Sequence, residues 1–195
     1  MSVLGIHVLG SPILRQETVP VAAITDDIRR LIDDMFETMY AARGIGLAAP
    51  QVGRRERVTV VDIQRDHTQP EPLVLVNPEI VSRDGTIRGE EGCLSIPEIY
   101  GDVTRAATVV VRALDRDGRQ FEVQGTEMLA RCLQHEIDHL HGRLFIDYLS
   151  ILKRRAAFAK WDDEKAKYPT LVRTITPAVP APAGSVADAH HDEEL

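Results

Sequence analysis

The chain has 195 residues, of which 44% are hydrophobic and 27% are charged, as in an ordinary folded protein. The length suits one domain, with or without a tail. The formal net charge of −7 argues against a general nucleic-acid clamp, so we expect no DNA partner. Two cysteines exclude a disulfide scaffold and favour a reducing compartment. Because the sequence has no basic leader and no apolar run of roughly 18 residues, it predicts a cytoplasmic protein that does not engage membranes.

The first clear element is a helix that begins after the capping residue Thr25 and ends at Gly44. Asp26 and Asp27 suit its first turn, where negative charge is stabilised by the helix dipole. Apolar residues recur at steps of three and one along this segment, which places them on one helical face. They are Ile28, Leu31, Ile32, Met35, Phe36 and Met39.

Strands are expected in the middle of the chain, over residues 58–63, 73–76, 108–114 and 120–123. The last two should form a hairpin, because residues 115–118 read Asp-Arg-Asp-Gly and supply a turn glycine.

Two further helices follow the strands. The second should run from a Thr126 cap to about His141 and stop at Gly142, and the third should start at Ser150 and end before Pro169. Strands grouped in the middle, with helices at either end, predict an α+β fold in which antiparallel strands pack around the second helix.

Residues 169–195 differ in composition from the rest of the chain. They hold four of the eleven prolines, and four acidic side chains against a single arginine. Such a segment buries too little apolar surface to offset its ordering entropy. We therefore expect one domain over residues 1–168 and a tail over 169–195 that is flexible or ordered only by contacts elsewhere. Leu171, Val172 and Ile175 form a short apolar cluster that could dock on the third helix or on a partner subunit.

The most informative motif is His135-Glu136-Ile137-Asp138-His139, on the second predicted helix. Two histidines four residues apart share one helical face, with Cβ atoms ~5–6 Å apart. This spacing suits two ligands of one metal ion. Glu136 flanks that face and can act as a general base on a water molecule, as in hydrolases with an HExxH motif.

A hydrolytic metal site needs a third protein ligand. One protease pattern would place a histidine where this chain has Phe145, so that pattern is excluded. Glu164 would make the protein a zinc protease, but it lies in a charged run typical of a solvated helix face. Cys93 follows Gly92 and could approach a metal as a thiolate. A closed structural site in a binding module would need a fourth ligand, for which Cys132 offers the spare thiol.

Three segments together resemble the peptide deformylase family: Gly44-Ile45-Gly46-Leu47-Ala48-Ala49-Pro50-Gln51, Glu91-Gly92-Cys93-Leu94-Ser95 and Gln134-His135-Glu136-Ile137-Asp138-His139. They match the family's GφGφAxPQ, EGCLS and HExDH motifs, in the family's order. Residues 11–15 and 115–118 are also similar to the family, and the resemblance covers about residues 1–160. It implies a metal-dependent hydrolase that removes the N-terminal formyl group, as formate, from N-formylmethionine of new polypeptides.

The resemblance also implies a role for each motif residue. Cys93, His135 and His139 would hold Fe²⁺, with Ni²⁺, Co²⁺ or Zn²⁺ able to take its place. Glu136 would move the proton of the attacking water to the leaving amine.

Other motif residues would stabilise the reaction and receive the substrate. The Gln51 side chain and the Leu94 backbone N–H would donate hydrogen bonds to the developing oxyanion. The substrate pocket would be formed by residues of the first motif, the second helix and the strand region: Ile45, Gly46, Tyr100, Met128 and Cys132.

Two expectations concern the surroundings of the site. Asp138 could pair with Arg105 behind the site and orient a metal ligand. The third helix carries basic side chains that could contact ribosomal RNA where nascent chains emerge. They are Lys153, Arg154, Arg155, Lys160, Lys165 and Lys167.

Overall fold

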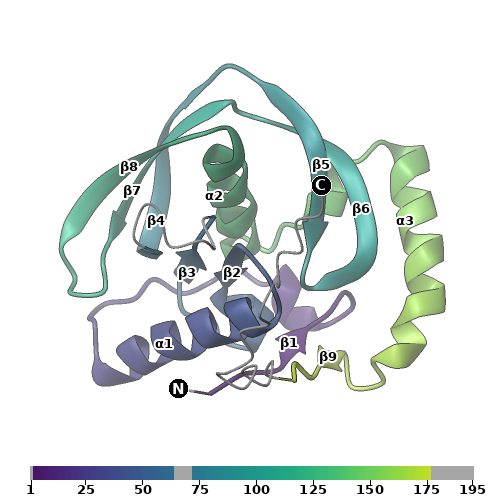
Figure 1. Cartoon of the computed structure of the whole chain (residues 1–195), viewed down its shortest axis with the longest axis horizontal. Helices are drawn as coiled ribbons and strands as arrows, with labels where there is room; N and C mark the ends of the chain where they lie inside the picture. The colour runs from purple at the N-terminus through teal and green to yellow at the C-terminus, as the bar shows by residue number, and fades with distance from the viewer. Residues whose placement is uncertain (1, 64–71, 177–195) are drawn as a thin grey trace, which may run out of the picture.

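The structure is a computed structural model that describes residues 2–63 and 72–176 (Figure 1). Within these residues, three α-helices combine with antiparallel strands in three sheets, which confirms the predicted α+β class. The helices are α1 (Asp26–Ala41), α2 (Glu127–Leu140) and α3 (Ile151–Glu164). The strands are β1 (Ile6–His7), β2 (Gly46–Ala48), β3 (Val58–Val61), β4 (Leu73–Asp84), β5 (Ile87–Cys93), β6 (Ile96–Arg105), β7 (Thr108–Leu114), β8 (Gln120–Thr126) and β9 (Val172–Arg173). No helix in the described part of the chain is long and apolar enough to span a membrane.

Helix α1 forms as its sequence predicts. The Thr25 side chain accepts a hydrogen bond from the Ile28 backbone N–H, which satisfies one of the free donors of the first turn. The apolar face is buried against β2 and β3, and its core cluster includes Met35, Met39 and Val60. Because β2 follows immediately, α1 delivers the Gly44–Gly46 segment to the centre of the molecule.

The five-stranded sheet has the order β2-β3-β4-β7-β8, and β5 and β6 form a separate two-stranded sheet. Figure 1 shows these strands arching around α2, which occupies the middle of the molecule. The hairpin expected over residues 108–123 is confirmed: β7 pairs with β8, and Gly118 takes a φ of +82° in the turn. Strand β4 is longer than predicted and runs on to Asp84, with an irregularity in its pairing after Val76.

Helix α2 is the element that carries the site. It buries most of its side chains, and Leu133 and Ile137 pack against the five-stranded sheet. Thr126 stands at its N-cap as expected, but its side chain makes no capping hydrogen bond within the described residues. At the other end, Gly142 has a φ of +67° and an added Cβ would lie 2.8 Å from the backbone of Arg15. Glycine is therefore required there to stop the helix.

Residues 171–175 of the predicted tail are ordered by contacts with the rest of the chain, which is the docking alternative of the sequence analysis. Val172 and Arg173 form β9, which pairs with β1 at the opposite end of the chain. Ile175 is 8% exposed and joins the core beneath α1, while Leu171 packs against the cluster that contains Trp161. Leu171, Val172 and Ile175 are the apolar side chains of this segment. Their contacts with the rest of the chain hold residues 171–175 in place. The remainder of the predicted tail, 177–195, lies outside the described residues.

Ending the chain at Tyr168 is expected to lower its thermal stability. The truncation removes β9 and the buried Ile175, and burying one such side chain is worth about 1.5–3 kcal/mol. A chain that ends at Thr176 is the matched control, because it keeps both. Thermal unfolding of the two chains is the measurement, and equal melting temperatures would show that residues 169–176 contribute nothing to the fold.

Candidate metal centre and catalytic cavity

Three potential metal ligands meet at one point in the centre of the molecule. Cys93 lies at the end of β5, and His135 and His139 lie one turn apart on α2. One donor atom from each lies within 4.8 Å of the others, and Cys93 Sγ is 3.2 Å from His139 Nε2. One thiolate and two imidazoles form a donor set that suits Zn²⁺, Fe²⁺ and other borderline metals. The three residues singled out by the motifs therefore form a candidate metal site.

Two buried polar atoms on α2 bear on whether this centre fits a bound metal. Among the described residues, Glu136 Oε2 and His139 Nδ1 are the buried side-chain atoms that lack a hydrogen-bond partner. Both belong to the HExDH motif. His139 Nδ1 lies on the side of the ring away from the Nε2 atom that faces Cys93, so it does not point to the candidate metal. Glu136 Oε2 is the informative atom, because an unsatisfied buried acceptor next to potential ligands is typical of a site that receives an ion, water or substrate. The donor set and the unsatisfied Glu136 acceptor together fit a bound metal.

Glu136 lies against the backbone of Gly46. A Cβ at position 46 would fall 2.4 Å from the Glu136 Oε1 atom, so only glycine leaves room for the carboxylate. Burial raises the pKa of Glu136 to about 7. A carboxyl group with this pKa can both accept and return a proton near neutral pH.

The Gln51 side chain is held so that the NH₂ of its amide faces Cys93. Its Oε1 accepts a hydrogen bond from the Ala48 backbone N–H at 2.8 Å, which identifies the opposite side of the amide as the donor. Nε2 lies 3.1 Å from Ser95 Oγ and 3.6 Å from Cys93 Sγ. The Gln51 side chain is buried and fixed at both ends, so its position relative to the candidate metal site is set by the fold.

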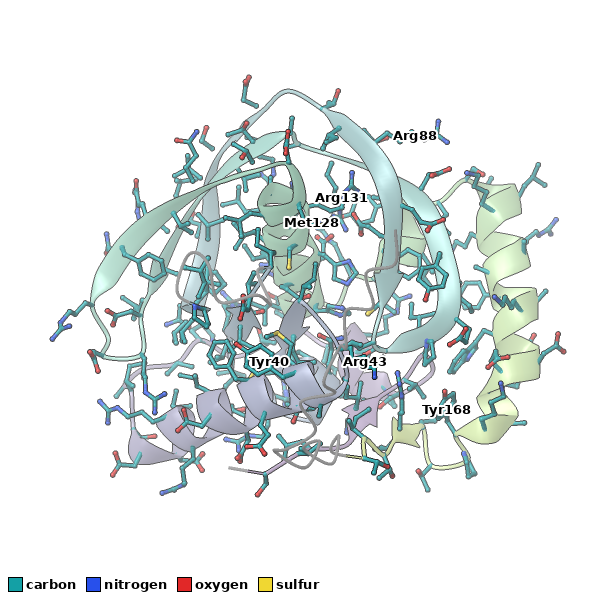
Figure 2. All side chains as sticks on the ribbon, in the orientation of Figure 1. Tyr40, Arg43, Arg88, Met128, Arg131 and Tyr168 are labelled. Atoms are coloured by element: carbon teal, nitrogen blue, oxygen red, sulfur yellow. The ribbon has the colours of Figure 1, made fainter. Side chains whose placement is uncertain are left out.

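Glu91 is the residue of the site to which the sequence analysis assigned no role. Its Oε2 accepts a hydrogen bond from His135 Nδ1 at 3.0 Å, which turns the other ring nitrogen toward the candidate metal site. Arg105 and Arg131 both donate to the same carboxylate. Figure 2 shows Arg131 reaching from α2 toward β5, whereas Arg88 on β5 points away from α2.

The charges around Glu91 are balanced. Arg105 pairs with both Glu91 and Asp138, so two buried arginines face two carboxylates. Burial alone would raise the pKa of Glu91, but hydrogen bonds from His135 and Arg105 outweigh it and hold the pKa below its usual range. The expected contact of Arg105 with Asp138 is present. Arg105 also binds Glu91, and Glu91 in turn binds the ligand His135.

Replacing Glu91 by Gln is expected to destabilise the fold and weaken metal binding. The change leaves one positive charge in excess among buried groups, and breaking a buried pair in this way costs about 3–5 kcal/mol. Loss of the His135 orienting bond should lower metal affinity about 10- to 100-fold. Glu90→Gln is the control, because Glu90 is the exposed neighbour on the same strand. Denaturant unfolding and metal titration of both variants test this, and equal behaviour would contradict the role given to Glu91.

A cavity of about 470 Å³ opens beside the ligands. All five residues expected to form a substrate pocket line it, together with Gln51, Leu94 and Glu136. Those five are Ile45, Gly46, Tyr100, Met128 and Cys132. The Tyr100 ring covers the backbone of Gly92, where an added Cβ would lie 2.7 Å from the ring.

Cys132 and Glu164 do not join the metal cluster. Cys132 Sγ donates to the Ile45 carbonyl at 3.5 Å, and burial raises the pKa of the Cys132 thiol well above its usual value. It is therefore placed as a neutral wall residue. Glu164 lies at the end of α3 and binds Lys167 Nζ at 2.7 Å. The alternatives of a closed four-ligand site and of a zinc protease with a Glu164 ligand thus find no support in the geometry of the described residues.

The chain is similar throughout this region to known deformylases. A family model described as polypeptide deformylase matches residues 3–155. The peptide deformylase of Alkalilimnicola ehrlichii is 56% identical over 155 residues, which are 80% of this chain and 86% of that protein. The peptide deformylase of Nitrosococcus oceani is 55% identical over 155 residues, 80% of this chain and 92% of that protein.

Solved structures agree. A peptide deformylase from Legionella pneumophila shares 50% identity with a TM-score of 0.81, covering 85% of this chain and 97% of that one. A peptide deformylase from Synechococcus elongatus, in complex with actinonin, shares 44% identity with a TM-score of 0.78, covering 82% of this chain and 88% of that one. The chain therefore belongs to the polypeptide deformylase family.

Proposed function

We propose that the cavity beside Cys93, His135 and His139 is where this peptide deformylase removes the formyl group from the N-terminus of nascent peptides, with Glu136, Gln51 and Leu94 as its catalytic groups. The observation that carries this assignment is the placement of Glu136 Oε2, a buried acceptor without a hydrogen-bond partner among the described residues, beside three metal-ligating side chains. A metal held by these three residues would act as a Lewis acid, lowering the pKa of water and polarising the formyl oxygen.

Glu136 acts as the general base and then the general acid of the reaction. Its carboxylate accepts a proton from water as the water oxygen forms a bond to the formyl carbon. The carbon–nitrogen bond then breaks, formate leaves, and Glu136 returns the proton to the amine of methionine. The pKa near 7 suits both halves of this cycle.

Gln51 and Leu94 stabilise the charge that develops on the formyl oxygen. Gln51 Nε2 is oriented toward Cys93 by the bond that its Oε1 accepts from Ala48. Leu94 follows Cys93 directly and lines the same cavity, which supports its backbone N–H as the second donor. Because the Gln51 amide is fixed by its contacts with Ala48 and Ser95 before substrate arrives, it needs little reorganisation during the reaction.

The methionine side chain of the substrate occupies the apolar part of the cavity. Ile45, Met128 and Cys132 supply its walls, and the Tyr100 ring stands at its side. Met128 is 55% exposed and Tyr100 is 61% exposed, which leaves apolar surface open for a substrate to cover. Arg105 and Asp138 act behind this site, through Glu91 on His135.

We propose Fe²⁺ as the working metal, with Ni²⁺, Co²⁺ or Zn²⁺ able to replace it. The Cys/His₂ donor set accepts all four ions, and the family resemblance favours iron. Anaerobic purification followed by metal quantitation tests this directly. Peroxide should inactivate the iron form faster than a nickel form, because Fe²⁺ and its thiolate ligand both oxidise. Equal inactivation of the two forms would count against iron.

Formate release from formyl-Met and acetyl-Met peptides tests the function itself. The assignment predicts release from the formyl peptide alone, loss of activity after chelation, and its return when metal is added back. Activity that survives complete chelation would overturn it.

We propose that residues 1–168 form the catalytic domain and that the protein works in the cytoplasm, where nascent chains are made. Residues 1–168 contain the three metal ligands and the proposed catalytic groups Glu136, Gln51 and Leu94. Strand β9 lies outside this range and stabilises the domain.

We further propose that α3 contacts the ribosome. Within α3 only Ala157 and Trp161 are buried, while Ile151 and Leu152 are each 77% exposed. Lys153, Arg154 and Arg155 follow Ile151 and Leu152 directly in α3 and are also exposed. Co-sedimentation with ribosomes at rising salt tests the contact, and no binding at low salt would exclude it.

A further inference from the structure

One cation of the catalytic cavity comes from outside the part of the chain that matches the family. Arg173 lies on β9 and lines the same cavity as Cys93 and Glu136. The family model ends at residue 155, so none of its motifs includes Arg173. The C-terminal segment thus adds a charged side chain to a cavity whose other lining residues come mainly from α2, β5, β6 and the segment between α1 and β2.

The backbone that carries Arg173 is fixed on both sides. Arg173 pairs in register with Ile6 of β1, and Val172 pairs with His7. Two residues later Ile175 is buried in the core beneath α1. Figure 1 shows β9 and β1 side by side, at the edge of the molecule next to α1. Arg173 is therefore held next to the cavity by an anchored strand.

The guanidinium of Arg173 has no ion pair or side-chain hydrogen bond within residues 2–63 and 72–176. Arg131, which lines the same cavity, is different: it binds Glu91 and the carbonyls of Gly89, Ile87 and Val103. Arg131 is held by contacts within the fold, whereas no described residue binds the five guanidinium donors of the half-buried Arg173, so among these residues they face the cavity unpaired.

We propose that Arg173 is a specificity residue that binds a carboxylate of the substrate peptide, in a side chain one or two positions after formyl-methionine. This inference rests on the proposed function of the cavity. With the formyl group at the metal ligands, and methionine against Ile45 and Met128, the chain continues at about 3.3–3.6 Å per residue along the remaining wall. Arginine matches a carboxylate with two parallel hydrogen bonds, which favours this ligand over other acceptors.

Two acidic residues of the cavity lie on another wall. Glu90 and Glu98 belong to β5 and β6, and they also border a second cavity, between β6 and α3. Glu90 and Glu98 favour a cationic side chain in the substrate residue that lies next to β6. The preference for an acidic side chain, which Arg173 would cause, should therefore be confined to one other position of the peptide. The test must therefore vary each position separately.

The experiment measures kcat/KM for formate release from formyl-Met-Ala-Ala-amide and from peptides with Asp, Asn or Lys at the second or third position. The metal-loaded full-length protein is compared with Arg173→Gln, Arg173→Lys and Arg173→Glu. At one position the wild type should prefer Asp over Lys by about threefold to tenfold, mainly through KM. Arg173→Gln should abolish this ratio, Arg173→Glu should invert it, and Arg173→Lys should keep part of it.

Arg55→Gln is the matched control, because it removes the same charge from an exposed site that does not line the cavity. It should keep the wild-type ratio, and the ratio should shrink as salt is raised. The inference is overturned if Arg173→Gln and the wild type show the same Asp to Lys ratio at both positions. Failure of every form to release formate from the neutral peptide would instead overturn the proposed function, so the two failures are distinguishable.

Discussion

Replacing Glu136 by Gln should reduce the rate of formate release by about 10²–10⁴-fold while the metal stays bound. Glutamine has the shape of glutamate but cannot accept the proton of the attacking water. It is not one of the three ligands, so metal content should be unchanged. The loss should fall on kcat rather than on KM, because the proton moves in the transition state and not during binding.

Stability provides a second readout for this substitution. Burial disfavours the charged form of Glu136, and its Oε2 has no partner among the described residues, so a neutral amide should leave the melting temperature unchanged or raise it. Glu127→Gln, on the exposed first turn of the same helix, is the control and should keep full activity. A Glu136→Gln protein with metal bound and near-normal turnover would show that another group moves the proton.

Replacing Cys93 by Ser should cost the protein most of its Fe²⁺ and, with it, its activity. A hydroxyl is a poor substitute for a thiolate toward a borderline metal. Loss of a residue that only orients a ligand lowers affinity about 10- to 100-fold, so loss of the ligand itself should lower metal affinity by at least about 100-fold. Metal content per chain and formate release, measured on protein kept anaerobic, are the two readouts.

Cys132→Ser is the matched control for Cys93. Cys132 is the other cysteine of the chain and lines the same cavity, but its Sγ bonds to the Ile45 carbonyl and lies outside the ligand cluster. The Cys132 variant should retain its metal even if its KM rises. A Cys93 variant with unchanged metal content would return Glu164 or another carboxylate to consideration as the third ligand.

Helices and ligands were predictable because their signals are local. The apolar spacing from Ile28 to Met39 defines α1, and Gly142 stops α2 where a side chain would strike the backbone of Arg15. His135 and His139 lie four residues apart on one helix, so sequence spacing alone places them on the same face. Cys93 required more, because its position depends on β5 meeting α2: the residues alone left it as one of several candidate ligands, and the motif resemblance selected it.

Strands β5 and β6 could not be predicted from the pattern of side chains. Strand β5 reads Ile-Arg-Gly-Glu-Glu-Gly-Cys, which lacks the alternation of a half-buried strand. The structure explains this: Glu91 points inward to two arginines and His135, so a charged residue occupies a core position. A buried ionic network is satisfied by partners far apart in sequence, and no local window contains them.

The position of Arg173 at the catalytic cavity could not be predicted from the sequence for a related reason. Its segment is rich in proline and poor in apolar residues, and composition alone favours a tail. The pairing of β9 with β1 joins residues more than 160 positions apart, and the burial of Ile175 depends on α1. Leu171, Val172 and Ile175 were the visible signal, but nothing in the sequence connected them to the catalytic cavity.

The position of the bond that is cut tests the central claim most directly. Mass spectrometry of the products from a formyl-Met tripeptide separates deformylation from peptide-bond cleavage. The arrangement of Cys93, His135, His139 and Glu136 predicts one product, the intact tripeptide with a free amino terminus, together with one formate per peptide consumed. Shorter fragments that keep the formyl group would contradict it and would show that the cavity hydrolyses internal peptide bonds.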